Sequence, residues 1–251
     1  MEVSIMAKET NMEAIKERAK ALFDVKIRTG VSPDKNILIR HPFYGDNLQP
    51  CQDSNGEIQR LNIFESPENL AKARALKSKF IDEANDVISI GNMLNRSCRL
   101  FFLKFVEDYL SPEDLSQYLT NFWESIEKEH TIGGVEKSKV KQWLTACGKE
   151  CFMSEWEKQL FDSFGDEVTI YRGVTDLSKD ALKSMMTWTI SYDDAVWYAQ
   201  RYLIRGIKKS YVYKAVIDKK HIYRCVHTES TDVIVDDQGI RDITLVETFT
   251  R

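Results

Sequence analysis

Three short segments in the last third of the chain place polar side chains on sequences typical of β-strands. The first, VTIYRG, ends with Arg172 and a glycine. The second, TWT, carries hydroxyl groups at Thr187 and Thr189, which the alternation of a strand directs to one face while Trp188 points to the other. The third opens with Asp232 and continues as VIV. An arginine, a hydroxyl pair and a carboxylate thus occupy three separate predicted strands.

These side-chain types are suited to an anionic ligand that develops positive charge as it reacts. The planar fork of donors in Arg172 fits phosphate or carboxylate oxygens two at a time, so an arginine at a strand end is well placed to hold an anion. A fixed carboxylate such as Asp232 stabilises a cation that forms only in the transition state. With the hydroxyl pair, these groups could bind a dinucleotide and stabilise a positive charge.

The order of the three segments resembles that of the mono-ADP-ribosyltransferases of the Arg–Ser–Glu type. In that family the arginine strand comes first, a Ser/Thr-x-Ser/Thr strand follows, and the carboxylate lies on a strand entered from a target-recognition loop. The helix-forming stretch MSEWEKQLFDSF, which leads directly into the arginine strand, is also similar to bacterial and phage members. The resemblance extends from residue 150 to the C-terminus and covers nothing before it.

The resemblance implies that NAD is the substrate and that Arg172 grips a phosphate and ribose of it. It implies that Asp232 is the catalytic carboxylate, held by a hydrogen bond from Thr187, and that Thr189 supports the strand. The carboxylate would stabilise the oxocarbenium-like cation left when nicotinamide departs, before a target nucleophile attacks. Three rings could stack on nicotinamide, and the two threonines and the glycine after the arginine are further implied contacts. The other implied NAD contacts are thus Tyr171, Trp188, Tyr192, Gly173, Thr187 and Thr189.

The sequence departs from the family at the carboxylate, in the stretch HTESTDVIVDD. The family usually has Glu-x-Glu before the hydrophobic strand, whereas here Ser230 is at the outer position and Asp232 at the catalytic one. Glu229 is one residue out of register and would share a face with Asp232 only if a loop or bulge turned it inward. Both acids are therefore candidates for the working carboxylate. In the family a glutamate at the outer position accompanies arginine targets, so Ser230 argues against arginine modification.

The segment DKKHIYRCVHTES, which precedes this strand, is basic and aromatic. That mixture suits single-stranded nucleic acid, through phosphate contacts and base stacking, and equally an acidic protein surface. The expected macromolecular target is therefore a protein or single-stranded RNA. The residues that carry this expectation are Lys219, Lys220, His221, Tyr223, Arg224 and His227.

The predicted fold class is α+β, with a helical N-terminal lobe over residues 1–150 followed by a small, mostly antiparallel sheet over residues 151–251. Ser-Pro-Glu sequences open two of the expected helices, because serine is a good N-cap and proline fits the first helical position. The segment 31–64 holds three of the five prolines and is expected to be an irregular connection or an extended arm. The expected helices span residues 67–90, 95–110, 112–130, 135–148, 153–164 and 193–203.

Composition narrows the function classes. With 35 basic and 39 acidic residues, a formal charge of -4 gives no global electrostatic case for nucleic-acid binding. No run of eighteen apolar residues occurs and the start is charged, so we expect neither a membrane span nor a signal peptide, and a cytoplasmic location. Five cysteines, an odd number, do not suggest a secreted disulfide framework.

No metal site is predicted, because the pair Cys147 and Cys151 lacks a partner motif, although a histidine (His130, His221 or His227) could complete a zinc ligand set. The acidic pair in DDQG, Asp236 and Asp237, is expected to form a hairpin turn.

Three hypotheses follow for the function. The first is an NAD-dependent mono-ADP-ribosyltransferase acting as a cytosolic toxin or phage-conflict effector. The second is a catalytically degenerate domain of the same type that binds a partner through helices 67–130. The third is a toxin whose helical lobe is covered by an antitoxin. Each site residue also has a structural interpretation: Arg172 could close a salt bridge, Asp232 could cap a loop, and the aromatic residues could pack in the core.

Overall fold

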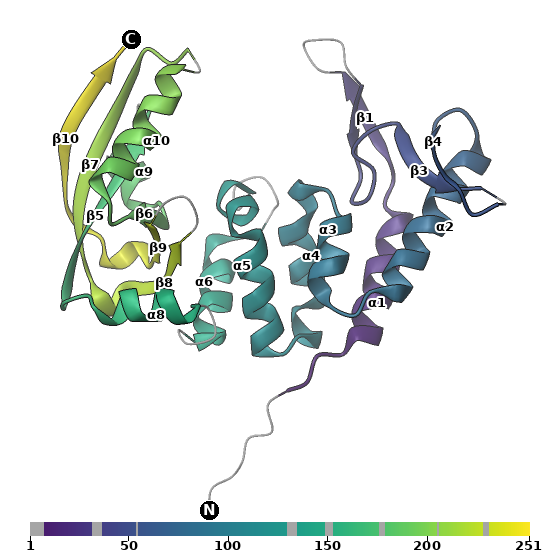
Figure 1. The fold of residues 1–251 in the computed structure, drawn as a ribbon, viewed down its shortest axis with the longest axis horizontal. Helices are drawn as coiled ribbons and strands as arrows, with labels where there is room; N and C mark the ends of the chain where they lie inside the picture. The colour runs from purple at the N-terminus through teal and green to yellow at the C-terminus, as the bar shows by residue number, and fades with distance from the viewer. Residues whose placement is uncertain are drawn as a thin grey trace, which may run out of the picture. The chain divides into compact units, whose positions relative to one another are not determined.

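The computed structural model describes residues 8–31, 37–53, 55–129, 135–148, 153–175, 179–204, 206–227 and 231–251. Figure 1 shows a helical part that leads into a part built on a sheet. With 49% of residues in helices and 27% in strands, the protein is mixed α and β, as predicted. The chain divides into an N-terminal unit, residues 1–140, and a C-terminal unit, residues 141–251, so the boundary lies ten residues before the predicted one.

Five helices form the core of the N-terminal unit. Three short 3-10 turns join them: Leu22–Asp24, Arg96–Cys98 and Glu107–Tyr109. Their packing buries Ile15, Ile90, Leu103 and Tyr118 completely, at 0% exposure each. In the described part of this unit no helix is both long and apolar enough to cross a membrane, and the same holds for the described helices of the C-terminal unit. The five helices are α1 Met12–Ala21, α2 Pro67–Glu83, α3 Val87–Met93, α4 Arg99–Val106 and α5 Pro112–Glu129.

The predicted serine caps are present, but one predicted helix is two. The Ser66 hydroxyl accepts a hydrogen bond from the Asn69 amide at 3.2 Å and begins α2. The prediction of a continuous helix over 67–90 is wrong, because α2 ends at Glu83 and α3 begins after Asp86. The Asp86 carboxylate accepts from the Ser89 amide at 2.7 Å, which makes it a competing N-cap inside the periodic stretch.

The segment expected to be irregular contains β-hairpins. Strands β1 (Arg28–Val31) and β2 (Ile37–Arg40) pair antiparallel, and so do β3 (Leu48–Gln52) and β4 (Ile58–Asn62). The second hairpin turns through Gly56, whose φ of 86° favours glycine. Pro50 lies within β3, which is an edge position where a missing amide hydrogen is tolerated. Strands of four and five residues are too short to show a clear period, which is why the sequence pattern missed them.

The C-terminal unit is built on one six-stranded sheet in which every neighbouring pair is antiparallel. The strand order is β10-β7-β5-β6-β9-β8. Its strands are β5 Glu167–Val174, β6 Thr187–Thr189, β7 Lys209–Asp218, β8 Ile222–His227, β9 Thr231–Val235 and β10 Arg241–Thr250. Its helices are α8 Glu155–Asp162, α9 Lys179–Lys183 and α10 Tyr192–Ile204, and α6 Lys137–Ala146 spans the boundary between the units.

The two faces of this sheet bury different sets of side chains. One face carries the larger core, in which Ile170, Trp188 and Val233 are almost fully enclosed. The other face is covered by α10, which packs its small residues Ala195 and Ala199 against the sheet. Figure 1 shows α10 running along the long strands β5 and β7. The 3.6-residue period of α10 and the two-residue period of the strands therefore fix which side chains meet.

The acidic pair expected in a hairpin turn has another role. Strands β9 and β10 are not neighbours in the sheet, so the hairpin prediction is wrong. A short 3-10 turn, Asp237–Gly239, joins them instead. The Lys141 ammonium donates to the Asp236 carboxylate at 2.7 Å and also to that of Asp237. Burial disfavours the charge on Lys141, but the two carboxylates outweigh that effect and raise its pKa.

This ion pair predicts a pH dependence of stability. We expect Lys141→Met to lower the free energy of unfolding by about 1–2 kcal/mol at neutral pH, as charged hydrogen bonds do. Because the folded-state pKa of Lys141 lies above its ordinary value of 10.5, the contribution is complete below pH 10.5 and is lost as the pH rises through the folded-state pKa. Urea denaturation of both proteins at increasing pH should show a constant difference in stability at neutral pH that narrows above pH 10.5. A gap between them that stays constant would contradict this account.

Candidate active site

The three motif strands lie side by side in the middle of the sheet. Strand β6 pairs with β5 through Tyr171 and Thr189, and with β9 through Thr189 and Asp232. Residues directly opposite one another across a sheet point to the same face. Tyr171, Thr189 and Asp232 therefore form one row on the face that α10 covers, and Thr187, two residues before Thr189, belongs to the same face.

Arg172 belongs to the other face by the same argument. It follows Tyr171 in β5 and pairs with Tyr213 of β7, whose ring packs against the larger core. Its neighbours at two-residue spacing, Ile170 and Val174, are part of that core. The register thus places the two threonines and Asp232 on one face of the sheet. It places the Arg172 side chain on the opposite face. A ligand that touches both Arg172 and Asp232 has to reach them at the ends of the strands.

The Asp232 carboxylate is held by a tyrosine from the covering helix. The Tyr198 hydroxyl of α10 donates to Asp232 Oδ2 at 3.1 Å. From sequence, Tyr198 is expected to do no more than pack beside its aromatic neighbours. The only signal that could have singled it out was its place in the helix that directly follows the TWT strand. The prediction that Thr187 holds this carboxylate is not tested by the contacts of the described residues.

A second set of hydrogen bonds fixes the residue before Asp232. The Thr189 hydroxyl donates to the Thr231 carbonyl at 2.8 Å, and the Asp194 carboxylate accepts from the Thr231 amide at 3.0 Å. The Ser191 hydroxyl in turn accepts from the Asp194 amide at 3.1 Å, at the start of α10. Both backbone groups of Thr231 are therefore held, so the start of β9 is anchored to α10.

The placement of Thr189 differs from its expected contact with NAD. Its side chain is almost completely buried, and its hydroxyl also accepts a hydrogen bond from the Ser191 amide at 3.1 Å. A buried hydroxyl group that donates one hydrogen bond to the backbone and accepts another from it stabilises the fold. Support of the strand, the other role that the family resemblance implies, agrees with these contacts.

Gly173 is needed for helix packing. A Cβ atom at this position would lie 2.1 Å from the Ala195 carbonyl oxygen and 2.5 Å from the Ala199 amide nitrogen. Only glycine lets the backbone of α10 approach β5 this closely. The expected contact between Gly173 and NAD does not follow from this position, because α10 already occupies the space. The glycine after the arginine is thus explained by the helix that covers the strand.

The three aromatic side chains expected to stack on nicotinamide differ in access. Trp188 is 1% exposed, and its indole N–H donates to the Met185 carbonyl at 3.1 Å, so it is a core residue with no ring face open to a ligand. Tyr171 and Tyr192 pack edge to face, with ring centroids 5.6 Å apart. The Tyr192 hydroxyl donates to the Glu247 carboxylate, and this hydrogen bond raises the pKa of Tyr192. Tyr192 is exposed and keeps a ring face accessible to solvent.

Much of the segment expected to bind the target stabilises the fold. Arg224 is buried and pairs with the buried Glu157 carboxylate at 3.3 Å, and burial lowers the pKa of Arg224. The Lys219 ammonium donates to two main-chain carbonyls at the end of α8, those of Asp162 and Phe164. His221 lies 3.5 Å from the Asp236 carboxylate. These contacts differ from the expectation of an open, basic binding loop.

Several predicted residues lie outside the described part of the chain. They include the alternative carboxylate Glu229, the outer position Ser230, and the potential metal ligands His130 and Cys151. The side chain of His227 is also outside it. Among the described residues, no group of three or more His, Cys, Asp or Glu side chains could hold a metal ion.

Burial raises the pKa of the Cys225 thiol to about 12, so this cysteine is an inert core residue.

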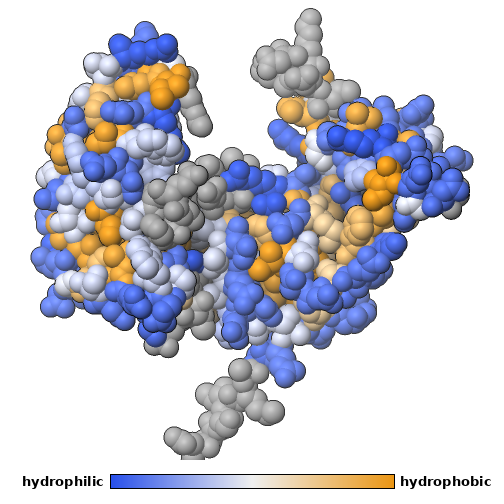
Figure 2. Space-filling view, viewed as in Figure 1, coloured by the Kyte–Doolittle hydropathy of each residue, from blue (hydrophilic) through white to orange (hydrophobic). Residues whose placement is uncertain are grey.

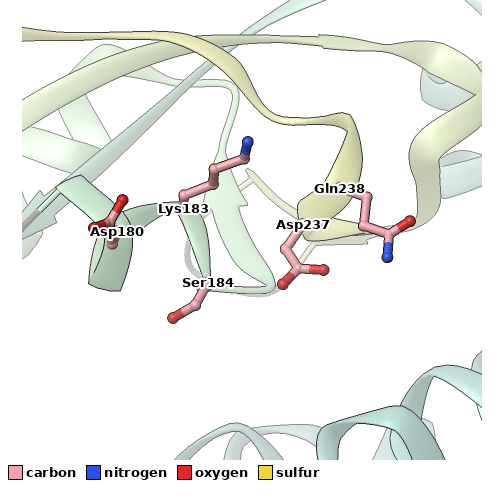
Figure 3. A pocket seen from close by; sticks show the side chains of 5 residues that line it. All are labelled: Asp180, Lys183, Ser184, Asp237 and Gln238. Carbon is pink, nitrogen blue, oxygen red and sulfur yellow. The ribbon is translucent and has the colours of Figure 1, made fainter.

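An open depression in the C-terminal unit has a volume of about 360 Å³. Figure 3 shows Asp180, Lys183 and Ser184 on one side of it, with Asp237 and Gln238 on the other. None of these residues belongs to the predicted site. The described residues that line it are all polar or charged types, so it lacks the hydrophobic and aromatic residues that usually line a small-molecule pocket.

The hydroxyl of Tyr198 predicts a kinetic effect. If Asp232 acts on NAD, Tyr198→Phe should lower kcat for nicotinamide release about tenfold and leave KM for NAD unchanged, because about 1.4 kcal/mol of positioning is lost only in the transition state. Tyr202→Phe, one turn further along α10, is the matched control and should have normal kinetics. Steady-state assays at several NAD concentrations separate the two constants. An increase in KM alone, or equal effects of both variants, would contradict a positioning role for Tyr198.

Comparisons of this chain with protein-family models, with curated proteins and with solved structures found no match. The function is therefore inferred from the residues themselves, from the family resemblance of residues 150–251, and from the arrangement of strands β5, β6 and β9.

Proposed function

We propose that the protein is a mono-ADP-ribosyltransferase that transfers ADP-ribose from NAD to a macromolecular target, a protein or a single-stranded RNA. The observation that supports this most is the adjacency of β5, β6 and β9. Segments that are far apart in the sequence, and that resemble the arginine, threonine and carboxylate motifs, are immediate neighbours in the sheet. The carboxylate is held by a hydroxyl group and the strand that carries it is anchored to α10.

The chemistry follows from these residues. The bond between ribose C1′ and the nicotinamide nitrogen breaks, and its electron pair leaves with nicotinamide. Asp232, kept in place by Tyr198, stabilises the cation that remains on the ribose. A nucleophile of the target forms the new bond to C1′ and gives up its proton to solvent. Arg172, from the end of β5, anchors the phosphates of NAD, a positioning role that lowers the entropic barrier.

The biological setting belongs to the same proposal. A small transferase with a separate helical unit fits a toxin or an effector of phage conflict that acts in the cytoplasm. The helical N-terminal unit would then bind an antitoxin or a regulatory partner. Purification of the chain with a small protein bound to residues 1–140 would support this setting.

A second candidate is a binding module that has lost the chemistry. Three observations favour it: an aspartate stands in the place of the usual glutamate, Trp188 is enclosed in the core, and Arg172 leaves the sheet on the face opposite Asp232. Aspartate is one methylene shorter, and active sites are built to tolerances near half an ångström. Such a protein would bind NAD or a partner and release no nicotinamide.

One experiment separates the two candidates. The purified chain is incubated with NAD labelled in the adenylate part and with total cell lysate, and nicotinamide release is measured together with label in protein and in RNA. Arg172→Ala, Asp232→Ala and Glu229→Ala are assayed beside it. Release that is lost in Arg172→Ala and in one of the acid variants would establish the transferase, its target class and its carboxylate. No release and no label in any fraction would exclude the transferase and favour the binding module.

A further inference from the structure

A cluster of aromatic rings around one arginine lies beside the Asp232 carboxylate. The Arg201 guanidinium carbon is 4.6 Å from the ring centroid of Tyr198, the residue that donates to Asp232. It is also 5.4 Å from the ring of Trp197 and 5.5 Å from that of Tyr202. All four residues belong to α10. The cluster therefore begins at the proposed catalytic carboxylate and continues along the helix.

The cluster presents a ring to solvent and holds the half-buried Arg201, whose Nε–H is enclosed and has no hydrogen-bond partner among the described residues. Trp197 is 56% exposed, although a tryptophan is among the residues that gain most from burial. Among the described residues, no carboxylate forms an ion pair with Arg201. Neither Trp197 nor Arg201 has a role in the proposed transfer of ADP-ribose. An exposed indole offers a ring face for stacking, and an arginine without an acidic partner can hold an anion beside it.

Positive charge continues beyond the cluster. The chain turns at Gly206, with a φ of 91°, and the Arg251 side chain lies against that turn. The Arg251 amide donates to the Lys208 carbonyl at 3.1 Å, which brings the two cations to the same end of the sheet. In the described part of the chain, neither Lys208 nor Arg251 forms an ion pair. Figure 2 shows hydrophobic and hydrophilic residues side by side over this end of the C-terminal unit.

We infer that the surface formed by Trp197, Arg201, Lys208 and Arg251 binds single-stranded nucleic acid and presents a base or ribose of it to Asp232. Stacking on Trp197 accepts any base, Arg201 pairs with a phosphate, and the cations at the end of α10 follow the backbone. An acidic peptide would use the cations but has no need of an exposed indole flanked by two tyrosines. The placement of a base or ribose of the nucleic acid at Asp232 rests on the proposed function. The binding of nucleic acid to this surface does not depend on it.

The alternative explanation of each cation is structural. Basic side chains near the end of a helix stabilise its dipole, and tryptophans on a helix often cover a neighbouring arginine. These effects explain single residues, but they do not explain why ring and charge coincide beside Asp232. A binding measurement distinguishes the explanations, because dipole effects change stability and leave ligand affinity alone.

The test uses the full chain and fluorescein-labelled RNA and DNA single strands of about twelve nucleotides, within the usual range of site sizes. Fluorescence anisotropy gives the Kd at several salt concentrations. We expect saturable binding that Trp197→Ala and Arg201→Gln each weaken by about fivefold or more, the lower end of the effect of one stacked base. Trp156→Ala, which removes the half-exposed tryptophan of α8, is the matched control and should stay within about twofold.

Salt dependence tests the cationic part of the surface. Lys208→Gln should reduce the slope of log Kd against log salt by about 0.7, the value for one phosphate contact on a single strand. Lys183→Gln, an exposed lysine on α9, should leave the slope unchanged. No saturable binding of either strand, or equal binding by the wild type and both cluster variants, would overturn the inference. Tighter binding of a labelled acidic peptide, lost in the same variants, would also overturn it and assign the surface to a protein.

The outcomes for the inference and for the proposed function are separable. Binding is measured without NAD, so a strand that binds while nicotinamide release is absent leaves this surface standing and removes the enzyme. Nicotinamide release without strand binding keeps the enzyme and removes the surface.

Discussion

Asp232→Asn is expected to lower nicotinamide release by at least about 100-fold, the effect of removing a group that stabilises transition-state charge. The substitution keeps the size of the side chain and the hydrogen bond with the Tyr198 hydroxyl, but it removes the negative charge that, in the proposed reaction, stabilises the ribose cation. Binding of NAD should change little, because the phosphates are held elsewhere in the proposal. Rapid assays of release and equilibrium binding of NAD measure the two effects separately.

Asp193→Asn is the control for this prediction. Asp193 is an exposed acid in the first turn of α10, and its replacement makes the same change of net charge on the same unit. Release by this variant should stay within about twofold of the wild type, since exposed charges interact weakly in water. Equal release by the wild type and Asp232→Asn would show that Asp232 is not the working carboxylate. Glu229→Gln would then be the next variant to assay.

Gly173→Ala should be the most destabilising single-methyl change in the C-terminal unit. The added Cβ would overlap two backbone atoms of α10, at 2.1 Å and 2.5 Å, and backbone cannot rotate away as a side chain can. Separating α10 from β5 would also uncover Ala195 and Ala199. Over-packing of this kind costs about 3 kcal/mol or more, and for a unit of this size that lowers the melting temperature by more than about 10 °C.

Thermal denaturation followed by circular dichroism measures this loss. Gly165→Ala is the matched control, because its Cβ would meet only one atom, at 4.0 Å, and its φ is not positive. The control should melt within about 2 °C of the wild type, as surface substitutions usually do. A Gly173→Ala protein with wild-type melting would mean that α10 does not pack against β5 as described, and the positions of Tyr198 and Arg201 would then lose their basis.

The two variants together distinguish a loss of activity at the site from a loss of folding. Asp232→Asn tests the chemistry in a fold that stays intact, and Gly173→Ala tests the helix that carries Tyr198 and Arg201. Loss of release in Asp232→Asn with unchanged melting points to the active site. Loss of release in both, with reduced melting in Gly173→Ala only, is the pattern that the structure predicts.

The sequence determined the local structure well. Serine before proline predicted the starts of α2 and α5, because the cap satisfies amides that the helix leaves unpaired. Ser154 and Glu157 form the reciprocal capping box of α8, since each side chain accepts from the other's backbone amide. Alternation predicted the three motif strands β5, β6 and β9, and the change from helical to strand periodicity predicted the α+β class. These signals depend only on residues close together in the chain.

Tertiary structure decided which faces and partners these elements have. A period of two tells which residues of one strand share a face, but the register between strands comes from packing, and a shift of one residue reverses every side chain. The sequence motifs therefore predicted that Arg172 and Asp232 belong to one site, whereas the register places their side chains on opposite faces of the sheet. The contacts of Asp232 with Tyr198 and of Arg224 with Glu157 join residues 34 and 67 positions apart. A local sequence pattern cannot predict these long-range contacts, because the free energy that stabilises them comes from burying α10 and α8 against the folded sheet.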